Sequence, residues 1–307
     1  VRRAHAADAV DVALDESGAT AASCATDGSV VVWDRLDGLG ATPPRPAHRL
    51  EAKKRDGCLC CDASRGVVIA ATTARTVALW DASSGRAKCE VNNAHGGSAK
   101  IYGARLFDGA TAFATCATDR LLKLWDVRRA GATPRAAPVG SRRAPSGGTS
   151  LAVASEVLLA TGHLDGVCRV WDTRSPDVAL ELEGLTAPVA GVACDARTSK
   201  VVVLGRDATV RVFDARTGAR LHALAHAALR VSAPAARVSL SPCGSYAAAP
   251  STTGDCVVFD VEAGVASVVL GPPGLHTPAV AAVAWSASRT RVQLATVDKE
   301  GGLALWD

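Results

Sequence analysis

TCATDRLLKLWD, residues 115–126, decides the fold, because much of it already stands earlier in the chain as SCATDGSVVVWD, residues 23–34. Both segments combine a short apolar stretch, a polar turn around an aspartate and an alternating run that ends in Trp–Asp. Alternation of this kind is typical of a β-strand, in which successive side chains point to opposite faces. Each segment therefore predicts two antiparallel strands joined by a tight turn.

The same ending recurs along the whole chain. An aromatic residue followed by aspartate stands at seven places, 42 to 47 residues apart: Trp33–Asp34, Trp80–Asp81, Trp125–Asp126, Trp171–Asp172, Phe213–Asp214, Phe259–Asp260 and Trp306–Asp307. A period of this length is typical of propeller blades of four strands each. A further apolar segment upstream of each ending, such as PVAGVACD at 188–195, predicts the innermost strand. The chain is therefore expected to be all-β, a seven-bladed propeller of four-stranded antiparallel blades, with residues 1–307 as one domain.

Composition excludes several classes of protein. Apolar residues make up 48% of the 307 residues, enough for a sizeable core, and the net charge of +4 does not favour a nucleic-acid partner. A run of about 18 apolar residues, as a membrane-spanning helix needs, is missing, and the first residues do not resemble a signal peptide. These features predict a cytoplasmic protein.

The cysteines raise the question of a metal. Three of the ten lie together in GCLCC, residues 57–61, but no second pair of ligands stands at the spacing of a zinc site. Cys24 and Cys116 occupy equivalent positions of the repeat, which favours small buried side chains in a reducing compartment. We expect neither a metal nor another cofactor.

Polar residues recur at fixed distances from the aromatic ending. An aspartate stands six residues before it in four blades, at Asp27, Asp119, Asp165 and Asp207, and a hydroxyl residue four positions earlier in three of them, at Ser23, Thr115 and Thr161. His5, His95 and His276 stand 28 to 30 residues before their tryptophans. A hydrolase needs one exposed nucleophile with its base in a pocket. Recurrence around a ring instead predicts a structural hydrogen-bond network, so we expect no enzymatic activity.

The pattern resembles the WD40 repeat family, in which a His–Ser/Thr–Asp–Trp hydrogen-bond chain ties the strands of one blade together. The resemblance implies complete sets in blade 1 (His5, Ser23, Asp27, Trp33) and blade 3 (His95, Thr115, Asp119, Trp125), and partial ones at Thr161, Asp165, Trp171 and Asp207. At the aspartate position blades 2, 6 and 7 have Ala74, Thr253 and Glu300, so these blades should depend on apolar packing.

The residue before each turn aspartate, or before the position equivalent to it, is expected at the top rim of the central channel, where a propeller can bind other proteins. We call the following seven the rim residues: Thr26, Thr73, Thr118, Leu164, Arg206, Thr252 and Lys299. The outermost strand of blade 7 should come from the residues before His5, where only VRRA stands, so either this strand is short or, as we expect, the natural chain extends upstream. Segments 36–56 and 130–148, rich in Pro, Gly and basic residues, should each contain an outer strand and a loop.

Longer phrases narrow the resemblance. ATGHLDGVCRVWDTRS at 160–175, RVSLSPCGSYAAAPS at 237–251, and AVAAVAWS at 279–286 followed by VDK are similar to the C-terminal WD40 domain of autophagy-related protein 16. That resemblance implies a scaffold that helps direct lipidation of a ubiquitin-like autophagy protein at forming autophagosomal membranes. The upstream part would bind the autophagy conjugation complex and dimerise through a coiled coil, and the propeller would bind adaptors or receptors.

The same resemblance implies that this chain is a C-terminal fragment, associated with membranes only through its partners. Animal members of the family attach to single membranes with the help of a Phe matching Leu164 and a Lys matching Ala187, and this chain keeps neither side chain. An alternative starts from WDVR, WDTR and FDAR, which resemble substrate receptors of cullin–RING ubiquitin ligases. Arg128, Arg174 and Arg216 would then contact the ligase adaptor. A generic WD40 scaffold is the third possibility.

Overall fold

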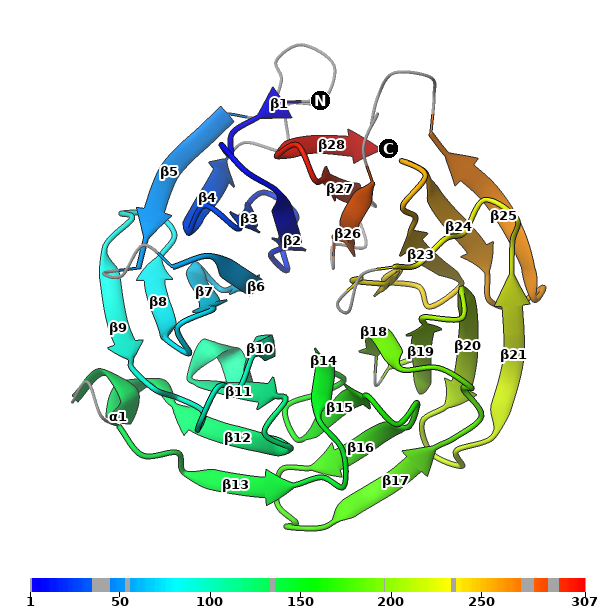
Figure 1. Cartoon of the computed structure of the whole chain (residues 1–307), viewed down its shortest axis with the longest axis horizontal. Helices are drawn as coiled ribbons and strands as arrows, with labels where there is room; N and C mark the ends of the chain where they lie inside the picture. Colours follow the sequence, from blue (N-terminus) through cyan, green and yellow to red (C-terminus); the bar gives the residue numbers. More distant parts are fainter. Residues whose placement is uncertain are drawn as a thin grey trace.

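The computed structural model describes residues 2–34, 45–52, 56–132, 136–195, 197–232, 236–271, 279–286 and 293–306. These residues form seven four-stranded sheets arranged in a ring (Figure 1). Neighbouring strands within each sheet are antiparallel, for example β10 with β11 and β11 with β12. The predicted seven-bladed propeller is therefore confirmed.

The first three blades run outward from the centre in chain order. Blade 1 comprises β2 (Ala9–Leu14), β3 (Ala21–Ala25), β4 (Ser29–Asp34) and β5 (Arg45–Glu51). Blade 2 comprises β6 (Cys58–Ser64), β7 (Val67–Thr72), β8 (Val77–Asp81) and β9 (Ala87–Val91). Blade 3 comprises β10 (Ile101–Phe107), β11 (Ala112–Ala117), β12 (Leu121–Asp126) and β13 (Gly140–Arg143).

The next three blades have the same order. Blade 4 comprises β14 (Gly148–Val153), β15 (Leu158–His163), β16 (Cys168–Asp172) and β17 (Val178–Leu182). Blade 5 comprises β18 (Val189–Asp195), β19 (Lys200–Gly205), β20 (Thr209–Asp214) and β21 (Arg220–Ala225). Blade 6 comprises β22 (Ser239–Leu240), β23 (Tyr246–Pro250), β24 (Cys256–Asp260) and β25 (Val265–Leu270).

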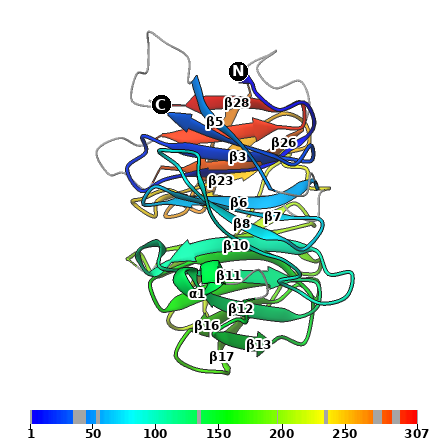
Figure 2. The same cartoon turned by 90° about the vertical axis from the view of Figure 1, so that its left-hand side faces the viewer.

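Blade 7 closes the ring with strands from both ends of the sequence. It comprises β26 (Val280–Trp285), β27 (Leu294–Asp298), β28 (Gly302–Trp306) and β1 (Arg2–Arg3). In the register of β1 and β28, Arg2 lies opposite Leu303 and Arg3 opposite Gly302. The two ends of the chain accordingly lie close together in both views (Figures 1 and 2). Of the two expected alternatives, the structure shows the short one: the residues before His5 supply the outer strand as the two-residue strand β1.

Within the described ranges, two short helical segments interrupt the strands. A 3₁₀ turn, η1 (Asp108–Ala110), joins β10 to β11, and α1 (Val127–Ala132) follows β12 directly. Asp126 Oδ1 accepts a hydrogen bond from the backbone N–H of Arg129 at 2.9 Å, as a helix N-cap does. Helix α1 lies against β9 of the neighbouring blade, and Ala130 is buried there. The repeat pattern gave no signal for this helix.

The core lies between adjacent blades rather than at the centre of the ring. One buried cluster joins Ile69 and Leu79 of blade 2 to Ile101 and Phe113 of blade 3. The rings of Phe113 and Trp125 stack within blade 3, with centroids 5.7 Å apart. Because a single sheet cannot bury both of its faces, each blade depends on its two neighbours.

The two segments rich in Pro, Gly and basic residues each contain the expected outer strand, β5 and β13. Their loop positions 35–44, 53–55 and 133–135 lie outside the described residues. Among the described residues, no helix is long and apolar enough to cross a membrane.

Candidate functional site

All seven rim residues occupy equivalent positions at one edge of the ring. The backbone N–H of each donates a hydrogen bond to a carbonyl in the segment that leads into the innermost strand. These pairs are Thr26 to Asp8 (2.9 Å), Thr73 to Gly57 (2.8 Å), Thr118 to Lys100 (3.1 Å), Leu164 to Gly147 (3.0 Å), Arg206 to Pro188 (3.0 Å), Thr252 to Arg230 (2.9 Å) and Lys299 to Ala279 (3.1 Å). One backbone contact, repeated in every blade, therefore holds the rim together.

The rim side chains differ in chemistry and are accessible. Thr118 and Thr252 are half-buried, and the other five rim residues are exposed. Leu164 is 45% exposed, whereas most leucines that the structure describes are buried. Ala187 immediately precedes Pro188, the acceptor for Arg206, so it lies at the same edge. Exposed side chains on a rigid backbone frame form a surface that can bind another protein.

A small cavity opens on this edge between blades 6, 7 and 1. It has a volume of about 80 Å³, and two rim residues, Thr252 and Lys299, line it. Val10 and Ala281 also line it, at the points where β2 and β26 skip a partner in their register with the next strand. Such β-bulges turn a side chain away from the regular direction of the sheet. The bulges therefore shape the floor of this part of the rim.

In blade 3 the predicted His–Thr–Asp–Trp residues are all in contact. His95 Nε2 lies 2.8 Å from Thr115 Oγ1, and His95 Nδ1 lies 2.9 Å from Asp119 Oδ2. Trp125 Nε1 donates to the same Thr115 oxygen at 2.9 Å. His95 and Thr115 are buried, so water cannot replace these bonds. The arrangement connects the entry loop, β11, the following turn and β12.

Blade 1 has a longer version of this chain. His5 Nε2 lies 2.7 Å from Ser23 Oγ, and Trp33 Nε1 donates to that oxygen at 2.9 Å. His5 Nδ1, however, lies 4.0 Å from Asp27 and instead contacts Ser29 Oγ at 2.7 Å. Ser29 in turn donates to Asp27 at 2.5 Å. Ser29, which the sequence pattern did not single out, therefore links His5 to Asp27 through its hydroxyl group.

Blade 4 takes its histidine from a different place. His163, on β15 itself, lies 2.7 Å from Thr161 Oγ1, to which Trp171 Nε1 also donates at 2.7 Å. Asp165 is not part of this chain and pairs with Arg169 at 2.9 Å. In the sequence, Gly162–His163 stood out only as part of the phrase ATGHLDG. Side chains two residues apart on a strand lie on the same face, so the position of His163 two residues after Thr161 could have revealed their contact.

The remaining aspartate of the set, in blade 5, has another partner. Asp207 of blade 5 pairs with Arg211 at 3.1 Å, where the aromatic residue is Phe213 and no indole N–H is available. In blade 7, Trp306 Nε1 donates to Thr296 Oγ1 at 3.0 Å. His276 lies outside the described residues.

Electrostatics agree with a structural function for the buried histidines. Burial, supported by the nearby positive charge of Arg49, lowers the pKa of His5 to about 4. Burial likewise lowers the pKa of His163 to about 4, with Arg169 acting in the same direction. For Asp27, burial alone would raise the pKa, but hydrogen bonds from Ser29 and Ala6 outweigh it and lower the pKa to about 2. At neutral pH the two histidines are therefore uncharged hydrogen-bonding groups.

The hydroxyl groups of these sets are inaccessible to a substrate. Ser23, Thr115 and Thr161 are each 0% exposed. Each hydroxyl already contacts both a histidine and a tryptophan. A nucleophilic site needs its reactive oxygen exposed next to an oxyanion site. These sets therefore tie strands together, and WD40 propellers in general are scaffolds of this kind.

The arginines of the WD-x-R series lie at the other edge of the ring, in the turns after the third strands. Arg174 pairs with Asp172 at 2.6 Å and Arg216 with Asp214 at 3.7 Å, yet both side chains stay largely exposed, at 72% and 78%. Arg128 is exposed on α1, in a different backbone setting. The three arginines therefore do not form an equivalent set.

The innermost strands enclose a central cavity of about 330 Å³, lined by residues of all seven blades. Arg237 of blade 6, which lines this cavity, forms an ion pair with Asp11 of blade 1. Arg105 and Arg237 also donate to the carbonyl of Cys61, at 3.0 Å and 3.2 Å. Burial raises the pKa of Asp11, while the two arginines oppose that change. The pair joins blades across the channel.

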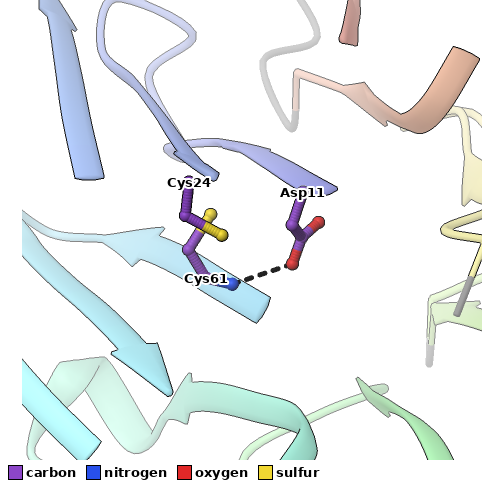
Figure 3. Close-up of side chains that lie close together, drawn as sticks. All are labelled: Asp11, Cys24 and Cys61. Carbon is purple, nitrogen blue, oxygen red and sulfur yellow. Dashed lines mark hydrogen bonds between the residues drawn. The ribbon is translucent and has the colours of Figure 1, made fainter. Parts of the chain in front are cut away.

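Three possible metal ligands meet beside this ion pair: Asp11, Cys24 and Cys61 (Figure 3). Their ligand atoms all lie within 4.8 Å of one another, and all three residues are buried. Asp11 Oδ2 already accepts the backbone N–H of Cys61 at 2.8 Å, besides its contact with Arg237. Burial raises the pKa of both thiols. Binding a metal here would require loss of two buried protons and displacement of an arginine.

Comparison with known proteins agrees with this architecture. The family model "WD domain, G-beta repeat" matches residues 1–34. The chain is 27% identical over 240 residues to "Autophagy-related protein 16" of Arabidopsis thaliana, which covers 78% of this chain and 45% of the relative. It is 29% identical over 154 residues to "Protein Atg16l2" of Mus musculus, covering 50% and 24% of the two chains.

A third relative spans nearly the whole chain. "Protein tipD" of Dictyostelium discoideum is 22% identical over 307 residues, 99% of this chain and 47% of the relative. The chain spans about half the length, or less, of these three curated relatives. The resemblance to WD40 repeats and to autophagy-related protein 16, expected from the sequence, is confirmed.

Proposed function

We propose that this chain, a WD40 propeller similar to autophagy-related protein 16, is the protein-binding domain of a subunit that helps direct lipidation of a ubiquitin-like autophagy protein to membranes. In this proposal the propeller catalyses nothing itself. It binds adaptors or receptors, while a region upstream of this chain binds the conjugation complex and dimerises. Membrane association then follows from the partners.

One observation supports the rim as the binding surface. The same backbone hydrogen bond recurs at all seven rim residues, so their side chains stand on a rigid frame. Five of them are exposed, and they include an apolar, a neutral polar and a basic type. A rigid surface of mixed chemistry can bind a partner without first losing conformational entropy, which lowers the cost of association.

The autophagy part can be tested in Arabidopsis plants that lack autophagy-related protein 16. The chain is joined to the part of that relative which precedes its matched region, and the lipidated fraction of the ubiquitin-like protein is measured by gel mobility. The relative without any propeller sets the baseline. We expect the fusion to exceed that baseline in lipidated protein and in membrane recruitment. A fusion that performs no better than the baseline contradicts the autophagy role.

The rim part is tested in the same fusion by a charge scan. Each rim residue is replaced in turn by Glu, and Leu221→Glu on the outer strand β21 is the matched control, because Leu221 and Leu164 are both 45% exposed. We expect at least one rim variant, but not the control, to lose membrane recruitment. If all seven rim variants match the parent, the rim is not the binding surface.

A ligase substrate receptor is the second candidate, favoured by the exposure of Arg174 and Arg216 at the opposite edge. In that case, capture of the purified cullin–RING adaptor should weaken in the Arg174→Ala variant. Capture that is absent, or unaffected by Arg174→Ala, eliminates this candidate.

A further inference from the structure

We propose that the rim between blades 5, 6, 7 and 1 binds a short acidic segment of a partner protein and takes one small aliphatic side chain of that segment into the rim cavity. The inference rests on the proposed function, because it assigns a ligand chemistry to one part of the rim. It concerns the cavity of about 80 Å³ described above and the basic side chains around it.

The cavity has the size and lining of a side-chain pocket. Its walls include Val10, Val231, Pro250 and Val280, and most of its accessible lining is apolar. A water molecule occupies about 30 Å³ in the liquid, so the cavity has room for a group of a few carbon atoms. Transfer of CH₂ groups from water into such a site is favourable. One aliphatic side chain of a ligand would therefore bind there favourably.

Basic side chains without acidic partners surround this pocket. Arg230 and Lys299 line it and are exposed. Arg206 is connected to it, because its Nη2 donates to the carbonyl of Ser232, another lining residue, at 3.4 Å. Within the part of the chain that the structure describes, no carboxylate forms an ion pair with any of these three. Their charges therefore remain available to a ligand.

The opposite edge of the ring shows that this is a local feature. There, Arg174, Arg216 and Lys88 each pair with the aspartate of the Trp–Asp or Phe–Asp ending of their own blade. At the rim, the turn aspartates Asp165 and Asp207 are already paired with Arg169 and Arg211. These two aspartates are therefore not available to neutralise the rim cations near the pocket.

One carboxylate does line the pocket. Asp8 is exposed, and its backbone carbonyl accepts the hydrogen bond from the N–H of Thr26. With Arg230, Lys299 and Arg206 counted against Asp8, the formal charge of this corner is +2, from three cations less one anion. An extended ligand also has backbone N–H groups, and the carboxylate of Asp8 can accept hydrogen bonds from them. The corner therefore favours a peptide with acidic side chains over a simple anion.

The number and arrangement of the cations favour a peptide over other polyanions. Recognition of an anionic membrane typically uses clusters of about 4–8 Lys and Arg residues on one surface. Strong binding to nucleic acid involves about 6–10 phosphate contacts. Three cations around a concave, apolar pocket match a short segment with one anchoring side chain instead.

The experiment measures binding of labelled heptapeptides to the purified chain by fluorescence anisotropy, up to millimolar protein. The probe is Glu-Glu-Glu-Val-Glu-Glu-Glu, compared with the same peptide carrying Gly for Val and with a version carrying Lys for every Glu. We expect the first to bind, the second to bind several-fold more weakly, and the third not to bind. Binding should also weaken when salt is raised to 0.5 M, because exposed charges are then screened.

The decisive variant is Arg230→Glu/Lys299→Glu, for which we expect at least a tenfold loss of affinity. Arg65→Glu/Arg86→Glu, two exposed cations at the opposite edge, makes the same change in net charge and should bind like the parent. Thermal melting of both variants checks that each is folded. Equal affinity of the two variants overturns the inference, as does binding to phosphatidylserine vesicles without binding to the acidic peptide.

The outcome is separable from that of the proposed function. If the rim scan shows loss of recruitment but the acidic probe does not bind, the rim stands as a binding surface and this ligand chemistry is wrong. If the probe binds as expected while the fusion fails to exceed its baseline, the acidic pocket stands and the autophagy role is wrong.

Discussion

His95 and Asp119 are directly hydrogen-bonded, with 2.9 Å between Nδ1 of the imidazole and Oδ2 of the carboxylate. The bond joins the loop that enters blade 3 to the turn between β11 and β12. Through its other nitrogen, His95 contacts Thr115 on β11. One buried side chain thus fixes the position of the rim residue Thr118 relative to the rest of its blade.

Removal of that carboxylate should destabilise the propeller. Asp119→Ala leaves His95 Nδ1 without its partner, and an unsatisfied buried polar group costs about 1–3 kcal/mol. We expect the free energy of unfolding, measured by urea denaturation, to fall by that amount. Asp177→Ala, at an exposed turn position, should have no measurable effect. An unchanged urea denaturation curve for Asp119→Ala would show that the bond between His95 and Asp119 contributes nothing to stability.

The two buried histidines should make the fold sensitive to mild acid. The pKa values of His5 and His163 are lowered in the folded state from 6.5 to about 4. Between these values the unfolded chain binds more protons than the folded one, so stability is fully present above pH 6.5 and decreases as the pH falls toward 4. Urea midpoints measured across this range should show the decrease. His163→Gln should reduce its slope, and an equal slope in the variant contradicts the assignment.

Gly191, which faces the segment that leads into blade 6, should not tolerate a side chain. A Cβ atom added at Gly191 would lie 2.2 Å from the carbonyl oxygen of Ala236, and backbone cannot move away cheaply. We expect Gly191→Ala to cost about 1–3 kcal/mol, the usual range for overpacking. Gly96→Ala, where a Cβ would meet nothing within 4 Å, should be neutral or nearly so in the same denaturation assay.

The ion pair in the channel should behave as a unit. Asp11→Ala leaves the positive charge of Arg237 without its carboxylate and the N–H of Cys61 without its acceptor, and breaking such a buried pair typically costs about 3–5 kcal/mol. Replacement of both charges, in Asp11→Leu/Arg237→Leu, should cost less than Asp11→Ala alone. A double-mutant cycle by urea denaturation measures this coupling, and additive effects would mean that the two residues act independently.

One thiol should react much faster than the others in the native protein. Cys243 is exposed; burial would raise its pKa, but hydrogen bonds from Ser241 and Ser245 lower it overall. Cys60 and Cys116 are buried, and burial raises the pKa of each. Titration with a chromogenic disulfide should show a fast phase of one thiol, which Cys243→Ser removes. A fast phase that persists in Cys243→Ser would place the accessible thiol elsewhere.

The repeat was visible in the sequence because a blade is a local unit. Strand alternation, the turn around Asp119 and the Trp125–Asp126 ending all lie within about a dozen residues. The complete His–Thr–Asp–Trp set of blade 3 was expected from the resemblance to WD40 repeats, with His95 standing 30 residues before Trp125. Blade 1 differed only because Ser29, two residues beyond Asp27, is close enough to intervene.

Elements outside the repeat pattern could not be foreseen in the same way. Helix α1 forms after Asp126, and its buried Ala130 packs against a neighbouring blade, which the strand period does not describe. His163 replaces the entry-loop histidine in blade 4, because a side chain two residues along a strand lies on the same face. Which histidine contacts the threonine hydroxyl in a given blade depends on which imidazole lies within hydrogen-bond distance of it, and the tertiary structure determines that distance.

The sequence by itself determined the number of blades, the strand order within each blade and the places of the seven rim residues, because period and alternation record which face of each strand is buried. Only the tertiary structure decided that Arg237 meets Asp11 across the channel, and that Arg206, Arg230 and Lys299 gather around one small pocket. These contacts join different blades. Closure of the ring sets the distances between these residues, and no spacing along the sequence specifies those distances.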